Sequence, residues 1–418
     1  MKNIKIAIVG AGPSGLVTAR RLKEHGYKYD VLEQAKTLGG AWAYTDRIGT
    51  DDNGLRTTCM YKDLITNVPK QLMACPGFPF SENKIKSYIN EVEVLEYYNS
   101  FADFFNLKEY IKYNTQVIRI TPFSDKWTVI TKNLMNKNRI QSETYNYVYI
   151  CNGRFSFPFV PEICGDHLFR GTKMHSCDFR KPGKCFENKR VLIIGGKTSG
   201  QDLAFRILEI AELVYLSTRE SEYVDRHEKL IIKPEVSQIT ENGAIFDDDS
   251  SELVDVILYC TGYLYNCPFI NDECGVRVEY NGVIPLYKHI MNIQHPTMYF
   301  ISLLYPITGS LCDLQVRFCI ALMEKKFQLP SKTDCLKEFE EFLRNKEKNN
   351  IAHKHIYKMS TTAESKEYCQ ELSKTANIPS VPIVLFNLFD KILSESSKQL
   401  CYKIIDDENF IEIDGDIV

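Results

Sequence analysis

Two glycine-rich turns carry residues whose types and spacing could bind phosphate groups. The first turn, residues 10–15, follows the apolar run 6–9, and the second, residues 195–200, follows the apolar run 191–194. In each case a helical pattern comes next, so backbone N–H groups at a helix N-terminus can meet a pyrophosphate. Two such turns predict two bound dinucleotides, and two dinucleotides in one chain indicate electron transfer between them.

The first turn has the residues that a dinucleotide requires. Gly10 permits the tight bend, Gly12 lets the backbone approach the pyrophosphate, and Gly15 allows close packing of helix on strand. Glu33 ends the next apolar run, eighteen residues after Gly15, where its carboxylate can accept hydrogen bonds from ribose hydroxyls. A glycine turn without a ligand is the alternative, but strand, helix and acid together favour a dinucleotide.

The second turn departs from this pattern in two ways. Lys197 stands where the middle glycine would be, which should alter the approach to the pyrophosphate, although its ammonium could contact phosphate. After the second strand of this unit, Ser217 and Arg219 replace the acid of an NAD site, and a hydroxyl with a guanidinium suits a 2′-phosphate. A solvated surface arginine is the alternative; the position after the strand favours NADPH.

The surrounding pattern predicts an α/β fold with two dinucleotide-binding, Rossmann-like domains, the second inserted into the first. The expected domain limits are 1–160, 161–265 and 266–418. The expected strands are 4–9, 29–33, 127–131, 145–151, 191–194, 213–217 and 256–259, and the expected helices are 15–25, one after Gly200, 311–325, 334–346 and 365–375.

Composition excludes several classes of protein. The 418 residues carry a net charge of −3, so no bulk field draws the chain to nucleic acid or acidic lipid. The longest apolar stretches, 298–304 and 381–389, fall short of the roughly 20 residues that span a bilayer. Fourteen cysteines lack metal-ligand spacing. We expect a cytoplasmic protein with reduced thiols, no signal peptide, no membrane anchor and no bound metal.

Residues 169–179, which read FRGTKMHSCDF, resemble the signature of the flavin-containing monooxygenases, FxGxxxHxxx followed by Phe or Tyr. The segment lies between the two glycine turns, as it does in that family. Other matching segments are Glu33 with 39–42, 66–70, 199–202, 260–263, 286–289 and 295–297, and the stretch 60–80 is most similar to soluble insect-type members. The resemblance covers most of the chain.

This resemblance implies FAD and NADPH as cofactors and oxygenation of a soft nitrogen or sulfur through a flavin C4a-hydroperoxide. It places Asn67 beside the flavin as the catalytic amide donor, whereas a turn-forming asparagine is the alternative. His175 is interpreted as a positioning residue, not a general base. The implied cofactor-binding residues are Gly10, Gly12, Pro13, Ser14, Gly15, Glu33, Gly40, Trp42, Thr66, Asn67, Gly195, Lys197, Thr198, Ser199, Gly200, Ser217, Arg219, Thr261 and Gly262.

Three other functions share parts of this pattern. A Baeyer–Villiger monooxygenase favours Trp at the position of Phe179, and a disulfide oxidoreductase needs closely spaced redox cysteines. A non-catalytic dinucleotide sensor would keep both turns. The sequence departs from the family at Lys197 and at Cys260, where alanine is common, and it has no hydrophobic C-terminal tail. The expected partners are O₂ and a small nucleophile, with tertiary amines or alkaloids first and sulfides second.

Overall fold

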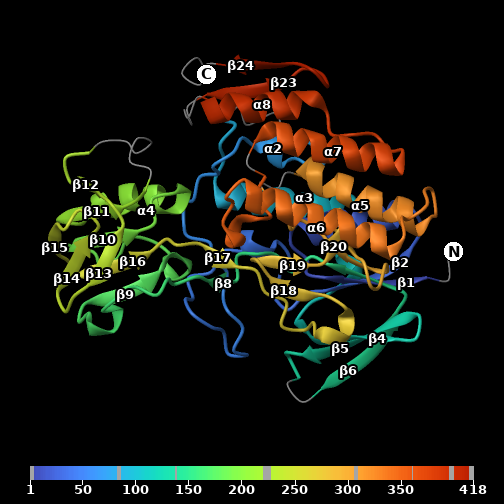
Figure 1. Ribbon diagram of the computed structural model, residues 1–418, viewed down its shortest axis with the longest axis horizontal. Helices are drawn as coiled ribbons and strands as arrows, with labels where there is room; N and C mark the ends of the chain where they lie inside the picture. The colour runs from blue at the N-terminus through green and yellow to red at the C-terminus, as the bar shows by residue number, and fades with distance from the viewer. Residues whose placement is uncertain are drawn as a thin grey trace. The chain divides into compact units, whose positions relative to one another are not determined.

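The computed structural model describes residues 4–81, 86–136, 139–219, 227–305, 309–359, 361–394 and 400–413 (Figure 1). The chain forms two compact units. Unit 1 comprises 1–43, 63–154 and 265–418, and unit 2 comprises 44–62 and 155–264. The second unit is therefore built from two separate segments of sequence, and the sequence did not predict that 44–62 would belong to it.

Unit 1 is organised by a seven-stranded sheet in the order β20-β21-β22-β7-β1-β2-β3. The strands from β22 to β3 run parallel to one another, while β21 is antiparallel to both of its neighbours, β20 and β22. The strands span Leu286–Tyr287 (β20), Met291–Asn292 (β21), Met298–Phe300 (β22), Tyr147–Ile150 (β7), Lys5–Val9 (β1), Lys28–Leu32 (β2) and Ile111–Lys112 (β3).

Helices pack against this sheet and against one another, with α1 contacting α5 and α5 contacting α7. Figure 1 shows α8 and the hairpin β23–β24 stacked beyond α7 at the C-terminal end of the chain. The helices are α1 (Pro13–Glu24), α2 (Lys70–Met73), α3 (Glu91–Phe104), α5 (Gly309–Met323), α6 (Lys332–Lys348), α7 (Thr362–Ala376) and α8 (Ile383–Ser394). The remaining strands are β4 (Thr115–Phe123), β5 (Lys126–Asn133), β6 (Ile140–Tyr145), β18 (Arg277–Glu279), β19 (Gly282–Ile284), β23 (Cys401–Ile404) and β24 (Phe410–Ile413).

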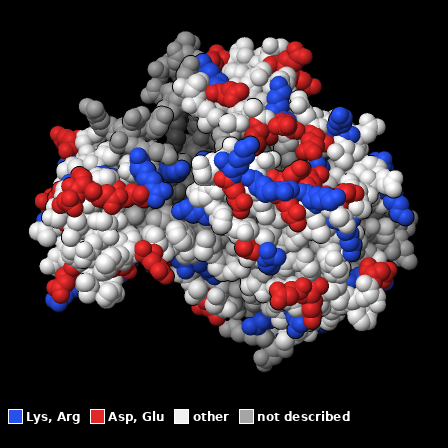
Figure 2. Space-filling model, viewed as in Figure 1, with Lys and Arg blue, Asp and Glu red and all other residues white. Residues whose placement is uncertain are grey.

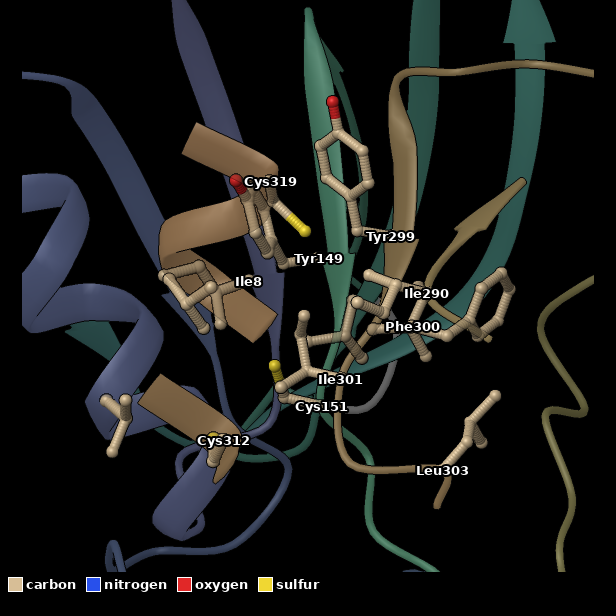
Figure 3. Close-up of a cluster of buried hydrophobic side chains, with 14 of the residues drawn as sticks. Ile8, Tyr149, Cys151, Ile290, Tyr299, Phe300, Ile301, Leu303, Cys312 and Cys319 are labelled. Atoms are coloured by element: carbon tan, nitrogen blue, oxygen red, sulfur yellow. The ribbon is translucent and has the colours of Figure 1, made fainter. Parts of the chain in front are cut away.

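The core of unit 1 explains why its central strands are apolar throughout. Figure 3 shows Ile8 of β1 and Tyr149 of β7 on the side of Cys312 and Cys319 of α5, with Phe300 of β22 extending away from that helix in the same buried cluster. These side chains are almost fully buried. Parallel strands covered on both faces read as continuous hydrophobic runs, which is the pattern that predicted β1 from the sequence.

Unit 2 contains a parallel five-stranded sheet in the order β12-β11-β10-β16-β9. Its elements are β9 (Thr172–His175), β10 (Arg190–Ile194), α4 (Thr198–Leu208), β11 (Leu213–Ser217), β12 (Leu230–Lys233) and β16 (Val256–Tyr259). A second sheet joins β13 (Val236–Ile239), β14 (Gly243–Phe246) and β15 (Ser251–Leu253), and β8 (Phe157–Pro158) pairs with β17 (Tyr263–Leu264).

Segment 44–62 is held in unit 2 by Arg180, which directly follows the signature segment. Arg180 is only 6% exposed. Its five N–H groups make seven hydrogen bonds, some of them bifurcated: five reach the backbone or side chains of 44–62, at Thr45, Arg47, Thr57 and Thr58, and two reach the carbonyls of Cys177 and Phe179. A buried cation is stable when its donors are satisfied in this way.

The strands expected at 4–9, 29–33, 191–194, 213–217 and 256–259, and the three late helices, are present. The strand expected at 145–151 is present as β7 (Tyr147–Ile150), but it begins two residues later than expected because Tyr145 belongs to β6 and the strand is interrupted at Asn146. Asn146 accepts a hydrogen bond from the Lys5 N–H, so β6 pairs with β5 while β7 pairs with β1. Within the described ranges, no helix combines the length and the apolar character needed to cross a bilayer.

Charged residues of both signs lie on the surface, in keeping with the small net charge of −3. Figure 2 shows Lys and Arg interspersed with Asp and Glu on the face in view. All fourteen cysteines are free.

Candidate functional site: two dinucleotide cradles

The first glycine turn is shaped by contacts that exclude side chains. Gly10 has φ +103°, and a Cβ at Gly10 would lie 2.6 Å from the Cys151 carbonyl oxygen. A Cβ at Gly15 would lie 1.9 Å from the Gly10 carbonyl oxygen. Gly10 therefore needs the left-handed bend, and Gly15 needs the close approach of α1 to the turn.

Gly12 leaves space at the N-terminus of α1 for a ligand, and we call this space, between the first glycine turn and the 3₁₀ turn Gly40–Trp42 (η1), the first cradle. Gly12 is the N-cap of α1, contributes no side-chain cap, and is followed by Pro13 and by a first helical turn without an acidic residue. A Cβ at Gly12 would lie 3.5 Å from the Cα of Gly40 in η1, where half-buried Trp42 also lies. Free N–H groups at a helix N-terminus bind anions, so this cradle fits a pyrophosphate.

Glu33 closes the turn from the end of β2. It is 7% exposed, and its carboxylate accepts from the Ala11 N–H at 2.6 Å and the Ala35 N–H at 2.7 Å. Burial raises the pKa of this carboxyl, and the backbone N–H donors oppose that rise. A carboxylate has about four lone-pair sites, and the Gln34 backbone also donates to this one, so about one acceptor site remains for a ribose hydroxyl.

Asn67 lies in a loop braced against the start of α3. The Thr66 N–H donates to the Ile89 carbonyl at 2.9 Å, and the Ile89 N–H donates to the Thr66 hydroxyl at 3.2 Å. Thr66 is buried and its N–H and hydroxyl oxygen both serve this bracing, whereas Asn67 is exposed. Within the described residues the Asn67 amide has no hydrogen-bond partner, and its φ is not positive, so it does not serve as a left-handed turn residue.

The second turn repeats the geometry of the first. Gly195 has φ +107°, and its Cβ would lie 2.6 Å from the Cys260 carbonyl oxygen. A Cβ at Gly200 would lie 1.8 Å from the Gly195 carbonyl oxygen. Lys197 is the N-cap of α4 with φ −83° and ψ −169°, close to the φ −76° and ψ −175° of Gly12. The lysine thus adopts the backbone conformation of the glycine it replaces.

The side chains around this turn differ in exposure. Lys197, Thr198 and Ser199 are exposed at the first turn of α4. The Ser217 hydroxyl is buried and donates to the Pro234 carbonyl at 2.9 Å, so a 2′-phosphate would compete with that carbonyl for this donor. Its binding role stays a prediction.

Arg219 follows β11 at the surface. Its side chain is 73% exposed and pairs with Glu235 at 2.5 Å between Nε and Oε2. The pKa of Arg219 is raised by this carboxylate. A guanidinium at this place fits a 2′-phosphate, which would have to displace Glu235.

His175 joins the signature segment to the end of β16. Its Nδ1 accepts from the Cys177 N–H at 3.1 Å, and its Nε2 lies 3.1 Å from the Gly262 carbonyl oxygen. Burial lowers the pKa of His175 to about 4. Both ring nitrogens of this neutral histidine are therefore used in positioning the chain, and neither is available as a base. Thr261 donates to the Phe159 carbonyl beside it.

The structure brings two residues to the first turn that sequence reasoning missed. The Ser302 hydroxyl lies 2.9 Å from the Ser14 hydroxyl, and Ser302 is itself held by Gln315. The only local signal was a polar residue two positions after the apolar strand β22, at the end of the apolar run 298–301.

Two glycine turns of this geometry, each at the N-terminus of a helix that follows a parallel strand, define a protein with two dinucleotide-binding units. The flavin-binding monooxygenase-like family model matches residues 3–230 and 226–395. A senecionine N-oxygenase of Tyria jacobaeae is 32% identical over 420 residues, which cover 97% of this chain and 91% of the relative. The flavin-containing monooxygenase FMO GS-OX3 of Arabidopsis thaliana is 31% identical, covering 84% of this chain and 80% of the relative.

Among solved structures, S-allyl-L-cysteine S-oxygenase from Allium sativum matches with a TM-score of 0.86 and 27% identity, covering 94% of this chain and 92% of that one. The chain belongs to the flavin-containing monooxygenase family, as the signature segment predicted. It is a flavin monooxygenase with FAD and NADPH as cofactors, and oxygenation of nitrogen or sulfur is the chemistry of its relatives.

Proposed function

We propose that this chain oxygenates small soft nucleophiles, with tertiary amines such as alkaloids as the first substrate class and thioethers as the second. The observation that carries the proposal is the repeated turn geometry, in which a Cβ at Gly10 or at Gly195 would lie the same 2.6 Å from an equivalent carbonyl oxygen. The similarity to a senecionine N-oxygenase along nearly the whole chain supports nitrogen as the acceptor. The similarity to S-allyl-L-cysteine S-oxygenase supports sulfur as the second candidate.

The chain's own residues bind and orient the cofactors in this proposal. The N-terminus of α1 binds the FAD pyrophosphate through its N–H groups, and Glu33 accepts from the ribose. The N-terminus of α4 binds the NADPH pyrophosphate with help from the Lys197 ammonium, and Arg219 binds the 2′-phosphate. Bound FAD supplies the oxygen-activating chemistry, with NADPH as the source of electrons.

Asn67 is the proposed catalytic residue. Its exposed amide can donate a hydrogen bond without releasing a proton, unlike a histidine or a carboxylic acid. Its backbone is fixed because Thr66, the preceding residue, bonds to Ile89 through both its N–H and its hydroxyl. A fixed neutral donor can stabilise oxygen activated on the FAD by a hydrogen bond. Because it gives up no proton, it does not speed the release of that oxygen as hydrogen peroxide.

The test is a panel of tertiary amines, thioethers and ketones with purified protein, NADPH and O₂. Released flavin should chromatograph as FAD, and amine products should gain the mass of one oxygen atom in proportion to NADPH consumed. Esters formed from the ketones would favour a Baeyer–Villiger monooxygenase. A sensor would be favoured, and the proposal contradicted, if the protein binds FAD but no compound stimulates NADPH oxidation and no oxygenated product forms.

A further inference from the structure

Ser302 has a backbone conformation that serine rarely adopts. Its φ is +67°, in the left-handed region where side chains are disfavoured. It follows β22, so it lies at the carboxyl end of the parallel strands, where ligands of α/β sheets bind. Figure 3 shows its neighbours Ile301 and Leu303 in the buried cluster beside α5. Such a conformation persists only when surrounding groups hold it.

Gln315 of α5 is the group that holds Ser302. Its side chain is fully buried, and its Oε1 accepts from the Ser302 N–H at 2.9 Å. The orientation of the amide follows from chemistry, because a backbone N–H can only donate and must face the oxygen. The amide nitrogen then donates to the Tyr368 hydroxyl at 3.1 Å, and that hydroxyl donates to the Lys288 carbonyl at 2.8 Å.

The far end of this network is fixed as well. Lys288 is 7% exposed and lies between α6 and α7, where its ammonium pairs with Glu338 at 3.0 Å and with Glu371. The path from Lys288 through Tyr368 and Gln315 to Ser302 is therefore a continuous chain of hydrogen bonds. The network ends at the Ser302 hydroxyl, which meets the Ser14 hydroxyl in the first turn of α1.

We infer that Gln315 is a positioning residue for the FAD site, which acts by holding Ser302 in its left-handed conformation against Ser14. This inference rests on the proposed assignment of FAD to the first turn. In that conformation the Ser302 hydroxyl lies at the N-terminus of α1, where the pyrophosphate binds. Without the Gln315 acceptor, Ser302 returns to an ordinary conformation and its hydroxyl leaves the cradle.

A Ser302→Gly substitution distinguishes this positioning role of Gln315 from a general role in packing, because glycine adopts positive φ without a side-chain penalty. Gln315→Met, which keeps the length of the side chain but not the acceptor, should weaken FAD binding about tenfold through the loss of a buried hydrogen bond and the strain it supports. In a Ser302→Gly background the same change should cost less than about threefold, since no strained residue remains to be held.

Tyr368→Phe is the matched control. It removes the other partner of Gln315 but leaves the Ser302 bond, so FAD affinity should stay within about threefold of the parent. Free flavin fluorescence on dilution of the full-length holoprotein gives each dissociation constant without an activity assay. Unfolding temperatures of the same proteins show how far each variant is destabilised in general.

Equal weakening by Gln315→Met with and without Ser302→Gly would overturn the inference, and so would weakening by Tyr368→Phe as large as that by Gln315→Met. Gly12→Ala, measured in parallel, tests the underlying assignment. If Gly12→Ala leaves FAD affinity unchanged, the first turn does not bind FAD and both ideas fail. If it weakens FAD but Gln315→Met does not, only the inference about Gln315 fails.

Discussion

Replacing Arg219 with alanine should reduce the preference for NADPH over NADH by a calculable amount. A charge-assisted hydrogen bond to a 2′-phosphate contributes about 1.5–3 kcal/mol. The structure lowers this figure, because Arg219 already pairs with Glu235 at 2.5 Å and must leave that partner to bind phosphate. An exposed ion pair is worth about 0.2–1 kcal/mol. The net contribution is about 0.5–2.8 kcal/mol, which is a loss of about two- to a hundredfold in preference.

Glu235→Gln is the companion variant, and it should act in the opposite direction. It removes the competing charge while keeping a side chain of similar size, so Arg219 no longer has an ion pair to break. The preference for NADPH should rise by about two- to fivefold, the reverse of the pairing energy.

The assay is the ratio of kcat/KM for flavin reduction by NADPH and by NADH, measured anaerobically at fixed ionic strength. High salt should shrink the effect of both substitutions, since Arg219 is 73% exposed and its charge is screened. An unchanged cofactor ratio in Arg219→Ala would refute the reasoning and leave Arg219 as a solvated surface residue paired with Glu235.

Three further predictions concern Asn67, the first glycine turn and His175 of the signature segment. Asn67→Ala should still bind FAD and allow its reduction, but the oxygenation step that the amide supports should slow about 10²–10³-fold, so that hydrogen peroxide replaces the oxygenated product. If NADPH consumption in the variant stays fully coupled to product formation, Asn67 does not have this role. Gly12→Ala should weaken FAD binding but leave the unfolding temperature of the flavin-free chain nearly unchanged, because the nearest atom to its Cβ lies 3.5 Å away. Gly15→Ala should cost about 3 kcal/mol of stability, because its Cβ would lie 1.9 Å from a carbonyl oxygen. Equal unfolding temperatures for the two variants would show that the chain relieves this contact easily. His175 has a folded-state pKa of about 4, below its ordinary 6.5, so the stability it contributes is present above pH 6.5 and is lost as pH falls toward 4. Chemical denaturation across that range should show the loss, and His175→Gln should flatten the slope; an unchanged slope would mean that other groups cause it.

The sequence predicted the parts of the site that local chemistry determines. The turns at Gly10 and Gly195 follow strands buried on both faces, whose continuous apolar runs are visible in one dimension. The long helix α3 escaped notice because its start, Glu91–Leu95, alternates acidic and apolar residues with the period of a strand. Its real signal was the capping box between Asn90 and Glu93, which the hydrophobic pattern obscures.

Other features depend on partners that are distant in sequence. The conformation of Ser302 is set by Gln315 on another element, so no property of serine itself predicts it. The pairing of Arg219 with Glu235 depends on the parallel register of β11 and β12, which places the two residues just beyond neighbouring strands. The loop of 44–62 carries no local sign that it belongs to unit 2.

The environment of Arg180 has a consequence for anyone who divides this protein into pieces. A fragment of residues 155–264 would include both glycine positions of the second cradle, yet it would lack the acceptors of five of the seven hydrogen bonds that Arg180 donates. Without segment 44–62 the Arg180 guanidinium would lose those five acceptors and the backbone that covers it, so water would have to take their place. A transplantable nicotinamide module should therefore carry segment 44–62 joined by a linker, which keeps the acceptors of Arg180 in place.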